Sequence, residues 1–182
     1  MSRPLQAGAA PGAGIVARRA RTADVPAIRG LLDVYTADRR LLSKATVTLY
    51  EDIQEFIVAD SDGHVVGCGA LHVLWDDLAE VRTLAVDPSF RGRGIGGLLL
   101  RRLLDIAAEL GVERVFCLTF ETEFFERFGF EEISGTPVPH DVFEQLLQSY
   151  DEGVAEFLDL ERVKPNTLGN VRMLLKLDGS GS

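Results

Sequence analysis

The residues best suited to chemistry form a turn rich in arginine and glycine, Arg91-Gly-Arg-Gly-Ile-Gly-Gly97, which an apolar, helix-like segment follows. The first four backbone amides of a helix have no partner within it, and the helix dipole places partial positive charge at that end. Glycines leave such amides uncovered, and Arg91 and Arg93 would add charge-assisted hydrogen bonds. The pattern predicts a site for the pyrophosphate of a phosphorylated cofactor.

Two other phosphate-binding turns fit this segment poorly. The dinucleotide-binding pattern GxGxxG needs an acidic residue at the end of the next strand, whereas Glu113 lies before the next strand-like segment. The phosphate loop of nucleotide triphosphatases ends in Gly-Lys-Ser/Thr, a tripeptide that does not occur in this sequence. For the hexapeptide alone, a turn that merely caps a core helix remains an alternative.

The spacing Arg91-x-x-Gly94-x-Gly96 resembles the Arg/Gln-x-x-Gly-x-Gly/Ala signature of the GCN5-related N-acetyltransferases (GNAT). This resemblance implies that the turn holds the pyrophosphate of acetyl-coenzyme A (acetyl-CoA), the co-substrate. It also implies that the backbone of Leu84 faces the acetyl carbonyl and that the backbone of Val86 pairs with the pantetheine arm. The cofactor-binding residues implied in the turn are Arg91, Gly92, Arg93, Gly94, Ile95, Gly96 and Gly97.

Three further stretches resemble the short actinobacterial amino-acid N-acetyltransferases of the N-acetylglutamate synthase type. They span residues 48–56, 118–125 and 163–170, and with the glycine-rich turn the resemblance covers about residues 16–177. It implies acetylation of the α-amino group of L-glutamate or L-glutamine, the first step of arginine biosynthesis. Because no activated nucleophile is evident, we expect direct attack on acetyl-CoA in a ternary complex.

Acetyl transfer to an amine requires a proton acceptor, because an ammonium group has no lone pair. Side chains alternate along a strand, so Glu80 and Arg82 should share one face with Leu84 and Val86 until a bulge intervenes. The family resemblance favours Glu80 as the general base, and the alternative is a solvated acidic residue at the start of a strand. A backbone N–H at Leu84 would stabilise the oxyanion of the tetrahedral intermediate.

The proton donor to the departing thiolate is less evident. The segment 124–130 resembles the family's short helix and Gly-Phe corner, but Phe125 stands where the family usually has a tyrosine. Thr119 and Thr122 offer hydroxyl groups nearby, and we take Thr122 as the candidate catalytic acid. A helix-capping role for Thr122, or protonation by water, are the alternatives.

A dicarboxylic amino acid needs cations, and arginine binds carboxylates in bidentate fashion. Arg82 is the first candidate, although it could instead pair with Glu80. Lys164 and Arg172 are further candidates for substrate binding, because they lie near the chain's end in or beside the segment 163–170. A basic cluster ahead of the second expected helix could contribute as well: Arg39, Arg40 and Lys44.

The pattern of apolar residues predicts an α/β (α+β) fold of GNAT type, a mixed and mostly antiparallel sheet flanked by helices. The expected strands cover 15–19, 55–59, a stretch from the Asp62-Gly63 turn to Trp75, a stretch starting near Glu80, 114–119, 156–160 and 172–177. The expected helices cover 22–35 with Thr22 as cap, 43–52, a stretch from the glycine-rich turn to Leu110, a short helix at Phe124, and 142–150. We expect one domain over 15–178, a disordered tail over 1–14 and a frayed end over 179–182.

Composition bounds the remaining possibilities. The chain has 182 residues, 46% of them hydrophobic, and a net charge of −9, which argues against nucleic acid as a partner. Cys68 and Cys117 lie in apolar runs and are expected to be buried free thiols, while His64, His72 and His140 do not have metal-ligand spacing. We expect a cytoplasmic protein without metal or membrane partner, and a homodimer through an exposed strand edge.

Two other functions stay open at this point. One is acetylation of a different small amine or of a protein N-terminus. The other is an acetyl-CoA-binding sensor without turnover, which the phenylalanine at position 125 motivates. Thiol release from acetyl-CoA in the presence of candidate amines separates these functions.

Overall fold

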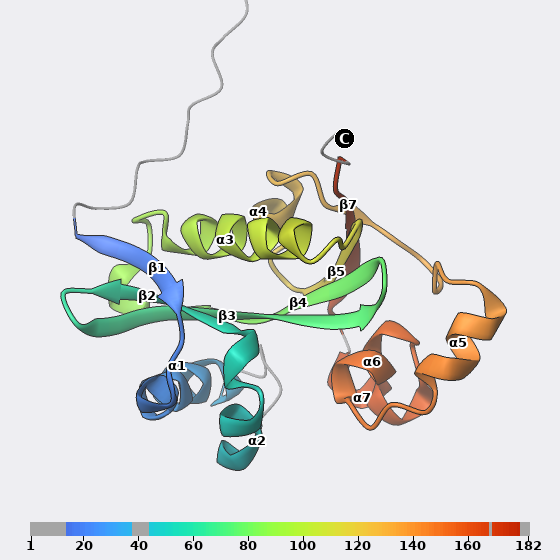
Figure 1. Cartoon of the computed structure of the whole chain (residues 1–182), viewed down its shortest axis with the longest axis horizontal. Coiled ribbons are helices and arrows are strands. Elements are labelled where there is room, and N and C mark those ends of the chain that lie inside the picture. Colours follow the sequence, from blue (N-terminus) through green and yellow to red (C-terminus); the bar gives the residue numbers. More distant parts are fainter. Residues whose placement is uncertain (1–13, 38–43, 168, 179–182) are drawn as a thin grey trace, which may run out of the picture. The chain divides into compact units, whose positions relative to one another are not determined.

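The computed structural model describes residues 14–37, 44–167 and 169–178, which fall into two compact units (Figure 1). The first unit comprises the described residues up to Ala70 together with Thr83–Leu103. The second comprises Leu71–Arg82 and the described residues from Leu104 onward. Of the tails predicted over 1–14 and 179–182, residues 1–13 and 179–182 lie outside the described residues, and Gly14 lies in a turn directly before the first strand.

The strands form a mixed sheet in the order β1-β2-β3-β4-β5-β7-β6. They are β1 (Ile15–Arg19), β2 (Phe56–Ser61), β3 (His64–Trp75), β4 (Leu78–Val86), β5 (Arg114–Thr119), β6 (Glu131–Glu132) and β7 (Val171–Lys176). The pairs β1–β2, β2–β3, β5–β7 and β6–β7 are antiparallel, and β4–β5 is parallel. The predicted fold class, a mostly antiparallel sheet with flanking helices, is confirmed.

Helices and short 3-10 turns connect these strands. The α-helices are α1 (Val25–Ala37), α2 (Thr46–Glu51), α3 (Ile95–Glu109), α4 (Thr122–Glu126), α5 (His140–Leu146), α6 (Glu152–Phe157) and α7 (Lys164–Thr167). The 3-10 turns are η1 (Thr22–Asp24), η2 (Ile53–Glu55), η3 (Pro88–Phe90) and η4 (Glu161–Val163). Among the described residues, no helix is long and apolar enough to cross a membrane.

In the first unit, β3 has helices against both of its faces, because alternate residues of a strand point to opposite sides. A Cβ atom at Gly67 or Gly69 would lie 3.0 Å from Leu99 or Leu103 of α3, so these glycines let α3 approach the strand closely. The opposite face packs against α1 and α2 (Figure 1). That cluster includes Ile28, Leu32, Leu49, Val58, Cys68 and Ala70.

In the second unit, α5 and α6 cover one face of the strands around β5. Phe116 of β5 and Phe157 of α6 meet edge to face with ring centroids 5.2 Å apart, a favourable aromatic geometry. The core around them includes Leu74, Leu78, Val142, Leu146, Val154, Leu158 and Leu174. Glu80 of β4 is paired in register with Phe116, so this packing also determines the surroundings of the candidate base.

The prediction of a strand over 156–160 is wrong, because the chain forms α6 there instead. Asp151 caps this helix by accepting a hydrogen bond from the amide of Val154, 3.0 Å away. Val154, Phe157 and Leu158 then reach the core at the i, i+3, i+4 spacing of a helix. The short strand β6 was not predicted.

The prediction that Thr22 caps the first helix is also wrong. The capping position is Arg21, whose backbone amide donates to the Asp24 carboxylate at 2.7 Å. Both cysteines, by contrast, are buried free thiols as predicted. Burial raises the pKa of Cys68 to about 12 and the pKa of Cys117 well above its ordinary value.

Candidate active site

The glycine-rich turn of the first unit has the geometry expected of an anion cradle. Asp87 begins it by accepting hydrogen bonds from the Ser89 amide at 2.8 Å and the Ser89 hydroxyl at 2.6 Å. Gly92 and Gly94 both have φ of +77°, a conformation that favours glycine. The 15-residue helix α3 starts directly after them at Ile95, so its first amides lie at the end of the turn.

The arginines of the turn are held by aromatic rings. The Arg93 guanidinium lies over the Phe90 ring, 4.6 Å from its centroid, and the Arg91 guanidinium lies 5.8 Å from the centroid of Tyr35. Arg91 also donates to the Tyr35 hydroxyl at 3.3 Å. Cation–π contacts of this kind restrict the orientation of the two arginines.

Strand β4 leads into this turn and supplies the backbone groups implied to face the cofactor. Thr83 has φ of +53°, a left-handed conformation that is uncommon for a residue other than glycine. Beyond it, Leu84 and Val86 are half-buried. The Val86 carbonyl, implied to pair with pantetheine, accepts a hydrogen bond from the Tyr35 hydroxyl.

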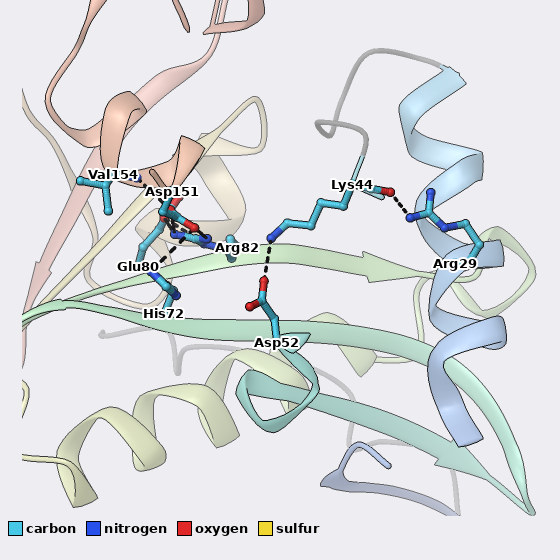
Figure 2. Close-up of polar contacts among 8 residues, drawn as sticks. All are labelled: Arg29, Lys44, Asp52, His72, Glu80, Arg82, Asp151 and Val154. Carbon is cyan, nitrogen blue, oxygen red and sulfur yellow. Dashed lines mark hydrogen bonds and ion pairs between the residues drawn. The ribbon is translucent and has the colours of Figure 1, made fainter. Parts of the chain in front are cut away.

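In the second unit, Glu80 and Arg82 lie on the same side of β4 and form an ion pair (Figure 2). The Glu80 Oε2 atom accepts from Arg82 Nη2 at 2.6 Å and from Arg82 Nε at 3.0 Å. The alternative role for Arg82, pairing with Glu80, is therefore the one present in this structure. Glu80 is only 3% exposed, so the alternative of a solvated strand-start residue is wrong.

Asp151 completes this cluster and was missed by the sequence reasoning. Its two carboxylate oxygens accept hydrogen bonds from Nη1 and Nη2 of Arg82, both at 2.8 Å, in a bidentate pair (Figure 2). Nε2 of His72 lies 3.8 Å from Asp151 Oδ2. Burial would raise the pKa of Asp151, but hydrogen bonds and charge from Arg82 hold it well below its usual range.

The same carboxylates act on Arg82. Burial lowers the pKa of this guanidinium, but the charges and hydrogen bonds of Glu80 and Asp151 outweigh burial, and the pKa is raised. A buried arginine with two carboxylate partners is held in one geometry, because losing either partner would leave buried N–H groups without an acceptor. This cluster fixes the orientation of the Glu80 carboxylate.

Comparisons with known proteins agree with this geometry. Residues 28–130, more than half of the chain, match the model of the acetyltransferase (GNAT) family. The chain belongs to this acetyltransferase family. As predicted from the glycine-rich turn, it is an acyltransferase that uses acetyl-CoA as co-substrate.

The names of several relatives of this acetyltransferase state a narrower activity or the ligands bound. An amino-acid acetyltransferase of Mycobacterium tuberculosis is 63% identical over 165 residues, covering 89% of this chain and 94% of the relative. The crystal structure of Rv2747 from the same organism, in complex with CoA and NLQ, matches with a TM-score of 0.87 and 62% identity, covering 90% of this chain and 99% of that one. N-acetylglutamate synthase from Neisseria gonorrhoeae, complexed with coenzyme A and N-acetyl-glutamate, matches with a TM-score of 0.72 and 25% identity, covering 90% of this chain and 35% of that longer chain.

The candidate proton donors of this acetyltransferase lie around the start of α4. Thr122 is the first residue of that helix, and the capping position is Glu121, so Thr122 does not cap it. The Thr119 hydroxyl instead accepts from the Glu121 amide at 2.8 Å. Phe125 is buried and meets the rings of its neighbours edge to face, so it contributes packing where the family usually has a hydroxyl.

The remaining cations proposed for substrate binding are not brought together with Arg82 by any contact described. Lys164 is half-buried and its Nζ lies 2.8 Å from Glu161 Oε1. Arg172 of β7 donates to the carbonyls of Gly135 and Phe157. In the first unit, Lys44 Nζ lies 3.7 Å from Asp52 Oδ2, and Arg29 donates to the Lys44 carbonyl (Figure 2). Arg39 and Arg40 lie outside the described residues.

Glu156 on α6 is the second residue that sequence reasoning missed, because its segment was interpreted as a strand. It is 7% exposed. Its Oε1 atom is buried without a hydrogen-bond partner. Among the described residues, no group of histidine, cysteine or acidic side chains could hold a metal ion.

Proposed function

We propose that this acetyltransferase acetylates the α-amino group of L-glutamate or L-glutamine, the first step of arginine biosynthesis. The observation that carries the proposal is the 63% identity, over nearly the whole chain, to a protein described as an amino-acid acetyltransferase. The N-acetyl-glutamate complex of the more distant Neisseria enzyme supports glutamate as the acceptor. The amine attacks acetyl-CoA directly in a ternary complex, without an acyl-enzyme.

The proposed cofactor contacts follow from the turn and from the strand that precedes it. The backbone amides of residues 91–97 and the guanidinium groups of the turn bind the pyrophosphate. The positive φ of Gly92 and Gly94 supports this assignment, because that conformation leaves the backbone amides of the turn uncovered. The Leu84 amide stabilises the oxyanion of the tetrahedral intermediate, and the backbone of Val86 pairs with pantetheine. These are backbone roles, so they depend on the path of β4 rather than on side-chain type.

For the acceptor, we propose Glu80 as the general base and Thr122 as the proton donor to the thiolate. Glu80 is supported by its burial and by the guanidinium that orients it. Arg82, Lys164 and Arg172 are the proposed cations for the carboxylates of the substrate. Arg82 has the bidentate geometry for this task, which it uses here for Asp151.

The test is thiol release from acetyl-CoA with each of the twenty amino acids, and with a few peptides and polyamines as alternative acceptors. We expect turnover with glutamate or glutamine well above the rest, and a product whose mass and NMR spectrum identify an N-acetylated α-amine. Glu80→Gln should reduce kcat by at least about 100-fold, as expected for loss of a general base. Turnover confined to peptides or polyamines would contradict the proposed substrate.

The assignments of domain, location and assembly are proposals of the same kind. We propose that residues 15–178 act as one acetyltransferase domain in the cytoplasm, with the amino acid and acetyl-CoA as ligands. The net charge of −9 disfavours a nucleic-acid partner. A homodimer is the assembly we propose, and sedimentation of the purified chain at micromolar concentration tests it.

A further inference from the structure

Helix α6 presents one face to the Glu80–Arg82 ion pair. Gly153, in its first turn, has no side chain, and a Cβ atom there would lie closer than 3 Å to Arg82 Nη2 and Glu80 Oε2. The backbone of α6 therefore lies directly against the ion pair. Asp151 fixes this contact from the end of the helix, because it binds both the Arg82 guanidinium and the Val154 amide.

Glu156 lies three residues after Gly153, so the two positions share a face of the helix. The face that carries Glu156 is thus the face that packs on the Glu80–Arg82 pair. Its side chain is 7% exposed, and the buried Oε1 atom has no hydrogen-bond partner. Burying an ionised carboxylate without a hydrogen-bond partner lowers the stability of the fold, so such a group is expected to carry a proton or to serve a function.

The charges around Glu156 are mostly negative. Glu80 and Arg82 act on it from β4, and Asp151 and Glu152 act on it from the start of α6. Burial is the largest influence, and repulsion from Glu80 adds to it against the attraction of Arg82, so that the pKa of Glu156 is raised to about 8. Arg172 of β7 donates to the backbone carbonyl of Phe157, which follows Glu156 in the chain, and not to the Glu156 carboxyl group.

We propose that Glu156 is a second acid–base carboxyl beside Glu80, which takes over the proton that the acceptor's ammonium group gives up. The N–H bond of the ammonium breaks and its proton passes through Glu80 to the Glu156 carboxylate. The nitrogen then forms its bond to the acetyl carbon and the C–S bond breaks. Thr122 donates its hydroxyl proton to the CoA thiolate and regains a proton from the nitrogen, so the second proton of the nitrogen ends on the thiol. Glu156 finally releases its proton to solvent, so one proton leaves per turnover.

A carboxyl whose pKa lies near that of an amine suits this role. Proton transfer from an ammonium of pKa near 8 to 9 to an ordinary carboxylate is uphill by about four pKa units, whereas transfer to Glu156 is nearly balanced. This inference rests on one part of the proposed function, namely that the acetyl acceptor is an amine. Glu156 acts through Glu80, so it is a positioning and proton-holding residue rather than a group in contact with the substrate.

The test is the pH profile of kcat at saturating substrates for the wild type, Glu156→Gln and Glu156→Asp. We expect the wild-type kcat to rise up to about pH 8 and then level off, because the ionised form of Glu156 is the active one. Glu156→Gln should lower kcat at pH 8 by about 100-fold and lose this limb, while Glu156→Asp should retain the limb. Glu144 is an exposed carboxylate on α5, so Glu144→Gln is the matched control and should keep the wild-type pH profile. A Glu156→Gln profile identical to that of the wild type would overturn the proposal.

A second measurement keeps the proposal testable if the variants fold poorly. Carboxyl ¹³C NMR of the wild-type protein labelled at glutamate should reveal one buried carboxyl that titrates near pH 8. If every glutamate carboxyl titrates below about pH 6, the proposal fails. Failure of the proposed function looks different, because a wild-type enzyme that rejects glutamate and glutamine but turns over another amine still yields the pH profile with that amine.

Discussion

The raised pKa of Glu156 has a consequence for stability that needs no substrate. Its ordinary value is 4.5 and its value in the folded chain is about 8, so between these limits the folded protein holds a proton that the unfolded chain has released. Stability rises with pH only where the unfolded state binds more protons, so here it must fall as pH rises. The contribution of Glu156 to stability is fully present below about pH 4.5 and is lost as pH rises toward 8.

The magnitude follows from the shift. One pKa unit corresponds to about 1.4 kcal/mol, and the window from pH 5 to pH 8 spans three units, which sets an upper limit of about 4 kcal/mol. Because the attraction of Arg82 offsets part of the effect of burial and of repulsion from Glu80, we expect about 2–4 kcal/mol. Glutamine has nearly the same shape and cannot ionise, so Glu156→Gln should gain this amount relative to the wild type between pH 5 and pH 8.

Urea unfolding of both proteins at pH 5, 6, 7 and 8 measures the difference directly. The expected result is a stability difference that moves steadily in favour of Glu156→Gln as pH rises. Glu144→Gln, whose carboxylate is exposed, should show a difference that is independent of pH to within about 0.5 kcal/mol. A Glu156→Gln difference that is equally flat would refute the reasoning, because Glu156 would then titrate alike in both states.

Three further substitutions follow from the geometry. Gly153→Ala should destabilise the fold by about 1–3 kcal/mol in urea unfolding and lower kcat, because its Cβ would run into the Glu80–Arg82 pair. Asp151→Asn should cost about 2 kcal/mol at pH 7, and this cost should shrink progressively as pH falls below about 4, since stability from a carboxyl with a lowered pKa is lost between its ordinary and its lowered pKa. Gly92→Ala should lower the free energy of unfolding by about 1 kcal/mol and raise the KM for acetyl-CoA, because an alanine disfavours the positive φ at this position. Gly30→Ala in α1 is the control and should be neutral or stabilising. A Cβ atom meets no obstacle at either position, so the two substitutions differ in the backbone conformation they require.

The local features of this chain were predictable from its sequence because they depend on neighbours along the chain. The glycine-rich turn needs two glycines at positive φ followed directly by a helix, and the residues of Arg91–Gly97 meet both requirements. The long strand before it and the buried thiols follow from runs of apolar residues. Even the shared face of Glu80 and Arg82 follows from the two-residue period of a strand.

The second half of the site was not predictable in the same way. The residues Glu156-Phe-Leu-Asp-Leu160 read as an alternating strand, and the helix that replaces it depends on Asp151 as a cap. A signal was present, since an aspartate followed at i+3 by an apolar residue and then by two more at helical spacing is typical of a helix start. What no local pattern contains is the choice of partner for Arg82, because Asp151 lies 69 positions away in the sequence.

Arg82 cannot hold Asp151 and a substrate carboxylate in the same bidentate geometry, because the fork formed by Nη1 and Nη2 is occupied. A carboxylate that binds there has to replace Asp151, and the outer edge of the guanidinium then again faces one anion. Its cost is the uncovered Asp151 carboxylate, which is moderate, since this side chain is already 23% exposed and lies 3.8 Å from His72. Glu80 keeps its bonds to Nε and Nη2 throughout, so the candidate base stays oriented while the other edge of the guanidinium changes partner. The same arrangement explains why Asp151 binds Arg82 so firmly: without a second carboxylate, Arg82 would bury an edge of its guanidinium without an acceptor.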